Sequence, residues 1–173
     1  MKAKLLFFSL VFAGLFLVSN RASAQDYRTA VGLRAAWGWG LSAKHFIKDG
    51  HALEGILRYR SYGSSVLGVS YKYSYLQISA LYQIHKEIPS IDGLMWYFGG
   101  GAVVGFYSGD GFDAIKGADG GTTIGISGNV GLDYKFANIP LNISADWIPT
   151  FVLNGYGNGF GAEGGGVAVR YTF

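Results

Sequence analysis

The sequence predicts an all-β fold, an eight-stranded antiparallel up-and-down β-barrel that crosses a membrane. The strongest indication is the segment 124–153, in which two runs of alternating apolar and polar residues flank a short turn at 137–140. Alternation with a period of two is typical of a strand with one apolar and one polar face. Each run is about ten residues or longer, the length that a tilted strand needs to cross a bilayer. We interpret this segment as one hairpin of the barrel, with its apolar face toward lipid.

The composition agrees with this fold. The 173 residues include 28 glycines, three prolines, no cysteine and 16 % aromatic residues. Many glycines and tyrosines, together with alternating runs, are typical of β-barrels. After residue 24, no segment has the 18 or more consecutive apolar residues that identify a transmembrane helix.

The first 24 residues are predicted to be a cleaved signal peptide. Lys2 and Lys4 form a basic start, residues 5–18 are apolar, and residues 22–24 read Ala-Ser-Ala, a small-residue cleavage site. The apolar run is too short to span a membrane, which disfavours an uncleaved anchor helix. We therefore expect export and a barrel domain of residues 25–173.

The charge of the chain disfavours a nucleic-acid partner. Three of the 14 basic residues lie in the signal segment, which leaves 11 basic and 11 acidic residues in the mature chain. The mature protein is therefore formally neutral, whereas a nucleic-acid-binding domain normally carries a basic patch. We expect no nucleic-acid partner.

Eight strands are expected along the chain. They cover residues 27–37, 41–47, 52–62, 74–85, 94–107, 124–136, 141–153 and 162–173. In the first strand, for example, Val31 and Leu33 face outward and Arg34 faces inward. The parity of the fifth strand is poor, because Gly99, Gly100 and Gly101 carry no side chain to mark either face. Pro149 interrupts the seventh strand and cannot donate to a ladder, so a bulge or bend is expected there.

The connections are predicted to alternate in length. Tight turns are expected at 38–40, 48–51, 86–93 and 137–140, and longer connections at 63–73, 108–121 and 154–161. The second tight turn carries the Asp49-Gly50 hairpin signal. Outer-membrane barrels have short periplasmic turns and longer external loops, so both termini are expected on the periplasmic side. The very short first external loop departs from this rule.

The predicted inner face carries most of the charge. Its members are Arg34, Lys44, Glu54, Arg58, Arg60, Asp133, Lys135, Asp146 and Arg170. Eight strands leave an interior just wide enough for side chains, and charges there must be paired. We interpret the set as a charge network that fills the lumen. A proton path, a gate or a catalytic cluster is the functional alternative.

Aromatic residues on the outer parity are expected at the two membrane interfaces. These are Trp37, Trp96, Tyr134, Phe136, Trp147, Tyr171 and Phe173. Their rings have an apolar body and suit the boundary between lipid and water.

The chain resembles the small eight-stranded outer-membrane proteins of Bacteroidetes-type bacteria, within the OmpA/OmpX-like barrel class. The resemblance rests on the segments DYKFANIPLNISADWIPTF (133–151), EGILRYR (54–60), LQISALYQIH (76–85) and VRYTF (169–173). It covers nearly the whole mature chain and implies a membrane barrel without an assigned activity. The alternate residues Val169, Tyr171 and Phe173 resemble the signal in the last strand that the outer-membrane assembly machinery reads.

No catalytic or metal site is predicted. His45, His51 and His85 lie on separate segments without the spacing of metal ligands. Ser79 and His85 share an inner parity but are too far apart along one strand to hydrogen-bond. We therefore expect no enzymatic activity, no metal and no cofactor.

The leading functional hypothesis is a non-enzymatic integral outer-membrane protein, a closed small barrel that displays surface loops in a structural or interaction role. The alternative is a small pore or ligand carrier across the outer membrane. A soluble lipocalin-like carrier is a weaker third reading, because it needs apolar residues inside the barrel. The expected partners are outer-membrane lipid and the assembly machinery, and the expected state is a monomer.

Overall fold

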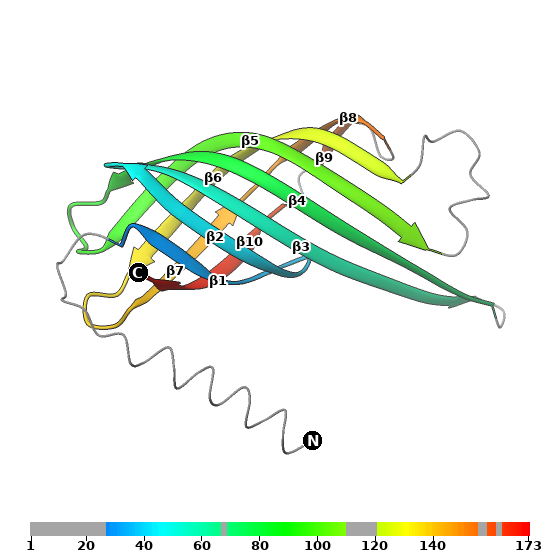
Figure 1. Cartoon of the computed structure of the whole chain (residues 1–173), viewed down its shortest axis with the longest axis horizontal. Coiled ribbons are helices and arrows are strands. Elements are labelled where there is room, and N and C mark those ends of the chain that lie inside the picture. The colour runs from blue at the N-terminus through cyan, green and yellow to red at the C-terminus, as the bar shows by residue number, and fades with distance from the viewer. Residues whose placement is uncertain (1–26, 67–68, 110–120, 156–158, 162–163) are drawn as a thin grey trace, which may run out of the picture.

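The computed structural model describes residues 27–66, 69–109, 121–155, 159–161 and 164–173 (Figure 1). The segments form an antiparallel sheet: β1 (Thr29–Ala36), β2 (Gly38–Lys48), β3 (His51–Val66), β4 (Val69–Glu87), β5 (Leu94–Gly109), β6 (Thr122–Lys135), β7 (Leu141–Trp147), β8 (Thr150–Asn154), β9 (Gly159–Gly161) and β10 (Gly166–Thr172). No helix in these ranges is long and apolar enough to cross a membrane. The predicted signal peptide and most of the predicted loop 108–121 lie outside the described residues.

The sheet closes on itself into a barrel of eight strands. Each strand pairs with its neighbour in sequence, and β10 pairs with β1, so that Ala30 faces Thr172 and Ala35 faces Val167. The segments β7 and β8 are two halves of one strand, because both pair with β6. Likewise, β9 pairs with β8 and β10 pairs with β7, so β9 and β10 form the last strand. The predicted fold class is confirmed.

The barrel is polar inside and apolar outside. Along β6, Ser127, Asn129 and Asp133 are buried, whereas the alternate residues Ile126 and Val130 are exposed. This order is the reverse of that in a soluble barrel. It follows from the period of two, because the polar parity of each strand points to the barrel axis.

The first turn differs from the prediction. Gly38, Trp39 and Gly40 belong to β2, and the turn is made by Trp37, next to Gly38 with its φ of +129°. Trp39 pairs with Ala35 on one side and Tyr59 on the other. The two glycines occupy the inner parity, so the alternation continues through this segment without an inner side chain to mark it.

The predicted loop at 63–73 is wrong, because β3 and β4 continue through it as a hairpin. The two strands remain paired up to Val66 and Val69, so only residues 67 and 68 separate them. In Figure 1 this hairpin extends beyond the neighbouring strands. Between residues 69 and 75, Val69 and three tyrosines alternate with Ser70, Lys72 and Ser74, but on the parity opposite to that of the outward Leu76 and Ile78. The lipid-facing pattern therefore stops here although the strand continues.

Pro149 divides β7 from β8 without shifting their register on β6. Val130 faces Trp147 and Ser127 faces Thr150, so the same number of residues lies between the two pairs on each strand. The backbone N–H of Gly128 donates to the carbonyl of Pro149 at 2.9 Å. The register shift in this strand pair lies nearer the end of β8, between Ile124 and Gly125 of β6. The interruption is therefore confirmed, but the bulge expected at Pro149 is displaced.

Candidate functional site in the barrel lumen

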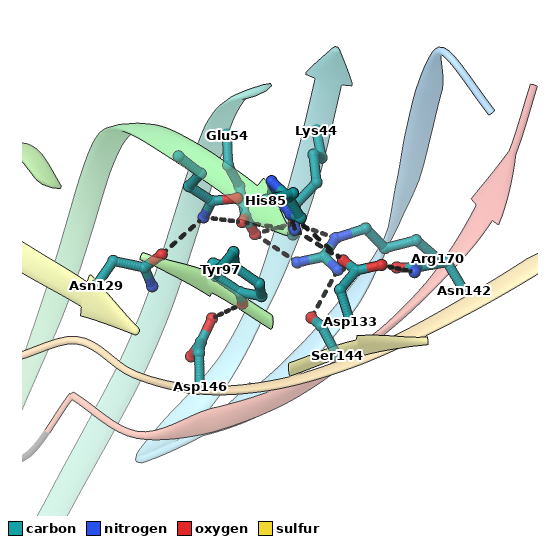
Figure 2. Close-up of polar contacts among 12 residues, drawn as sticks. Lys44, Glu54, His85, Tyr97, Asn129, Asp133, Asn142, Ser144, Asp146 and Arg170 are labelled. Atoms are coloured by element: carbon teal, nitrogen blue, oxygen red, sulfur yellow. Dashed lines mark hydrogen bonds and ion pairs between the residues drawn. The ribbon is translucent and has the colours of Figure 1, made fainter. Parts of the chain in front are cut away.

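Four charged side chains from four strands meet inside the barrel (Figure 2). Lys44 of β2 lies with Nζ 2.9 Å from Oδ2 of Asp133 on β6 and 3.6 Å from Oε2 of Glu54 on β3. Arg170 of β10 lies with Nη2 2.5 Å from Oε1 of Glu54. The side chains of all four residues have no exposed surface. Two cations and two anions therefore balance each other, and we call this cluster the plug.

Neutral polar side chains complete the coordination of Arg170. Its Nε donates to Oγ of Ser42 at 2.7 Å, and its Nη1 donates to Oδ1 of Asn142 at 3.1 Å and to Oγ of Ser144 at 2.7 Å. Ser42 in turn donates to Oε1 of Glu54 at 2.7 Å. A buried ion pair is favourable only when additional hydrogen bonds satisfy its remaining donors and acceptors, and these contacts supply them.

Asp133 is the meeting point on the other side of the plug. It accepts hydrogen bonds from Lys44, from the amide of Asn142 and from the hydroxyl of Tyr27, at 3.2 Å. Tyr27 lies just before β1, where burial and the neighbouring Asp133 raise its pKa well above the usual value. Its hydroxyl therefore stays protonated and donates to the carboxylate, which ties the start of the described chain to the plug.

Aromatic rings pack against the same cations. The ring of His85 stacks on that of Tyr97 with centroids 4.7 Å apart. Nζ of Lys44 lies 4.3 Å from the centroid of Tyr97, a cation–π distance, and 3.4 Å from Nε2 of His85. Lys44 is therefore enclosed by two carboxylates and two rings.

A second ion pair lies beside the plug. Both Nη atoms of Arg34 on β1 donate to the two carboxylate oxygens of Asp146 on β7. The hydroxyl of Tyr97 donates to Oδ2 of Asp146 at 2.7 Å. The two-pronged contact is the strong geometry for arginine and carboxylate. Tyr97 connects this pair to the plug, because its ring also contacts Lys44 and His85.

The structure separates the nine predicted lumen charges into groups. Lys44, Glu54, Asp133 and Arg170 form the plug, and Arg34 and Asp146 form the second pair. The other three lie elsewhere. Arg58 donates to Oε1 of Gln77, and Arg60 lies 4.9 Å from the ring centroid of Trp37. Lys135 donates to the backbone carbonyls of Phe136 and Ile139 at the turn, so its assignment to the lumen network is corrected.

The pattern of charges missed the neutral members of the cluster. Ser42, Asn142 and Ser144 share the inner parity of the charged residues, which is the signal that identifies them. Tyr97 was not assigned to the inner face, because the glycines at 99–101 carry no side chains and interrupt the alternation of this strand. Gly99 and Gly101 face inward without leaving spare room, because a Cβ there would lie 2.0 Å and 1.9 Å from backbone oxygens of β4.

Three buried polar atoms near the plug have no hydrogen-bond partner within the described ranges. They are Oε1 of Gln83, Nδ1 of His85 and Nδ2 of Asn129. Gln83 uses its amide nitrogen to donate to Glu54 at 2.7 Å and to Asn129 at 3.0 Å. Buried polar atoms of this kind are normally satisfied by ordered water.

The outer surface carries the predicted interface aromatics. Trp37, Trp96, Trp147 and Phe173 are exposed, and Tyr134, Phe136 and Tyr171 are half-buried. Two pairs of these rings pack edge to face: the centroids of Tyr134 and Phe136 are 4.8 Å apart, and those of Tyr171 and Phe173 are 4.9 Å apart. Both pairs lie at the end of the barrel where residues 88–93 and 136–140 connect strands, which we call the short-turn end. We call the other end, where β3 and β4 reach their tip, the hairpin end.

The chemistry of the lumen is that of paired charges. In the described part of the chain, no three histidine, aspartate or glutamate side chains converge in a way that would hold a metal ion. The carboxylates of Glu54, Asp133 and Asp146 are each engaged by cations and hydrogen-bond donors. This arrangement cross-links the walls of the barrel.

No protein-family model and no curated protein sequence matches this chain. Among solved structures, the chain is similar to the N-terminal β-barrel domain of Pseudomonas aeruginosa OprF, with 17 % identity, 86 % of this chain and 100 % of that chain covered, and a TM-score of 0.46. It is similar to Neisserial surface protein A, with 18 % identity, coverage of 84 % and 93 %, and a TM-score of 0.48. It is also similar to Ail of Yersinia pestis in complex with the heparin analogue sucrose octasulfate, with 13 % identity, coverage of 84 % and 94 %, and a TM-score of 0.44. At these identities the similarity concerns the fold, so function is argued below from the residues of this chain.

Proposed function

We propose that this chain is a non-enzymatic integral outer-membrane protein, a closed barrel that holds the β3–β4 hairpin and its neighbouring connections at the cell surface. The membrane location is supported by the outer surface of the barrel. Large apolar side chains such as Leu33, with 61 % of its surface exposed, and Ile126, with 56 %, cover the outward parity. A continuous apolar band of this size is unstable in water, whereas lipid is its natural solvent.

The plug is the observation that carries the closed-barrel role. Four strands contribute one charged residue each: Lys44 from β2, Glu54 from β3, Asp133 from β6 and Arg170 from β10. Their side chains meet with no exposed surface. An eight-stranded barrel is only wide enough for its side chains, so a cross-linked cluster at this position fills the lumen. The alternative of a small pore or ligand carrier across the outer membrane requires these ion pairs to break.

The orientation and the exported location extend this proposal. We place the short-turn end in the periplasm and the hairpin end outside, as in other outer-membrane barrels. Residues 1–24 would direct export, and Val169, Tyr171 and Phe173 would present the last strand to the assembly machinery. The affiliation with Bacteroidetes-type proteins stays a prediction from the sequence segments that suggested it.

Conductance in planar bilayers tests the closed barrel. We expect no stable channel openings when the folded mature chain is reconstituted. Glu54→Ala, which breaks the plug, is compared with Asp92→Ala, which removes an exposed carboxylate at the short-turn end. We expect openings, if they occur at all, to be confined to the plug variant. Frequent and stable openings in the wild-type chain would overturn the proposal and favour the small pore.

A further inference from the structure

The inner face of the barrel carries apolar side chains at one level, beside the plug on its hairpin-end side. Ile56, Leu81 and Ile148 form one cluster there, with 5 %, 1 % and 8 % of their surface exposed. Ile56 lies one inner position nearer the hairpin end than Glu54 on β3, and Leu81 faces Glu54 across the ladder with β4. Ile148 follows Asp146 by one inner position in the same direction. We call these three side chains the apolar layer.

On the hairpin-end side of the apolar layer the lumen is polar again. A cavity of about 20 Å³, room for about one water molecule, lies against Ile56 and Ile148. Its polar lining residues include Arg58, Gln77 and Ser79. Arg58 is only half-buried, so solvent reaches this level of the lumen. The apolar layer therefore separates two polar regions, the plug and an outer part of the lumen that solvent reaches.

The second ion pair, Arg34 with Asp146, lies beside the apolar layer. Arg34 lines the same cavity as Ile56 and Ile148, and its side chain is only 3 % exposed. Its two Nη atoms donate to the two carboxylate oxygens of Asp146. Because these charged groups are bound to each other, the pair does not provide a hydrated path past the apolar layer.

We propose that Ile56, Leu81 and Ile148 form a hydrophobic barrier that keeps water from the hairpin end out of the plug. Apolar side chains at a narrow point offer water no hydrogen bonds, so such constrictions stay dry and stop ions by dewetting. The exclusion of water lowers the local dielectric constant, which strengthens the ion pairs of the plug. The proposal rests on the closed barrel and adds a second barrier to it, in series with the charges.

Hydrogen exchange of side-chain amides tests this barrier directly. The folded mature chain in phosphatidylcholine nanodiscs is transferred to D2O, and NMR follows the amide protons of Gln77 and Gln83. Gln77 lines the outer cavity, whereas Gln83 donates to Glu54 at 2.7 Å on the plug side of the apolar layer. We expect Gln77 to exchange faster than Gln83 in the wild-type chain. Exchange of Gln83 as fast as that of Gln77 overturns the proposal.

A pair of variants with the same shape separates the barrier from ordinary packing. Ile56→Thr and Ile56→Val differ in that only threonine brings a hydroxyl, which can hold water in the apolar layer. We expect Gln83 to exchange about tenfold faster in Ile56→Thr than in Ile56→Val, because a hydroxyl binds water where a methyl group does not. Gln77 should exchange alike in both variants. Equal exchange of Gln83 in the two folded variants overturns the proposal.

A second pair of variants and a conductance measurement complete the test. Folding is checked by heat-dependent gel migration, and if Ile56→Thr does not fold, Leu81→Asn against Leu81→Met supplies the same comparison. Conductance of the wild-type chain in planar bilayers separates this proposal from the closed barrel. A silent wild-type chain with rapid exchange at Gln83 overturns the hydrophobic barrier alone, whereas stable channel openings overturn the closed barrel.

Discussion

Arg170 and Glu54 join their charges across the lumen, with Nη2 of the arginine 2.5 Å from Oε1 of the glutamate, although the two residues are 116 positions apart in sequence. The arginine projects from β10 and the glutamate from β3, so the contact connects walls that share no backbone ladder. Such a contact acts as a strut, because its stability depends on the whole barrel having closed. Several measurable properties depend on it.

Glu54→Ala should destabilise the folded barrel by about 3–5 kcal/mol, because the change leaves the buried Arg170 without a carboxylate and leaves Lys44 with Asp133 alone. Unfolding by urea in liposomes, followed by tryptophan fluorescence, measures the change. Asp92→Ala at the exposed short-turn end should stay within about 0.5 kcal/mol of wild type. A similar loss of stability for both variants would show that the ion pairs of the plug contribute no more to stability than an exposed carboxylate does.

Asp146→Ala should also destabilise the barrel, by about the same few kcal/mol, since it leaves Arg34 buried without its partner and removes the acceptor of Tyr97. The same unfolding assay applies. Tyr97→Phe is the matched comparison, because it removes only the hydroxyl donor and should lose less. If Asp146→Ala matches wild type, the second ion pair is not a structural element.

Leu132→Arg should destabilise by about 2–4 kcal/mol if the site lies near the bilayer midplane, because its side chain faces outward and is half exposed. Asn138→Arg in the turn should have little effect. Asn142→Arg, although it has the opposite parity, is unsuitable as a neutral comparison because Asn142 is fully buried against Arg170 and Asp133. A larger loss for Asn138→Arg than for Leu132→Arg would contradict the assignment of the lipid face.

Two glycine replacements should have opposite signs. Gly101→Ala should be destabilising, by about 1–3 kcal/mol, because its Cβ would strike the backbone of Ala80. Gly55→Ala on the outer face of β3 meets no atom within 4 Å and should stabilise by up to about 1 kcal/mol. Both are measured by the same unfolding experiment. Equal effects would mean that the glycine run on β5 is not closely packed.

Epitope insertion tests the orientation. A tag within residues 108–121 should be accessible to antibody on intact cells, whereas a tag between residues 137 and 140 should become accessible only after the outer membrane is permeabilised. A folded control is provided by heat-dependent migration of each variant. Labelling of the second tag alone on intact cells would reverse the proposed orientation.

The sequence was sufficient to predict the strands and faces wherever side chains of two kinds alternate. Val31 and Leu33 beside Arg34, or Ile126 beside Ser127, mark their faces locally, because parity needs no knowledge of the partner strand. Where the inner residue is glycine, as at Gly38 and Gly40, no side chain marks the inner face. The sequence there predicted a turn, although the segment is part of a strand. The outer part of the β3–β4 hairpin was missed for another reason: at residues 69–75 the apolar and aromatic residues change to the parity that faces inward further along β4, so the lipid-facing pattern stops before the strand does.

The composition of the plug followed from parity, but its pairing did not. Which cation meets which anion depends on the stagger between strands that are distant in sequence, such as β3 and β10. Lys135 shares the inner parity with Asp133, yet it lies close enough to the turn to bond backbone carbonyls instead. Parity fixes the direction of a side chain, whereas depth along the axis decides its partner.

The seam between β1 and β10 also sets an order of events. The backbone N–H of Arg28 donates to the carbonyl of Phe173 at 3.1 Å, and that of Phe173 donates to the carbonyl of Thr29 at 2.8 Å. Until this seam forms, β1 and β10 are both unpaired edges, which are templates for pairing with other chains. Contacts between the two ends of a chain form slowly, because the whole intervening segment must be ordered first. An unfinished barrel is therefore the most vulnerable form of this protein, and the interval before closure is when a chaperone would protect it.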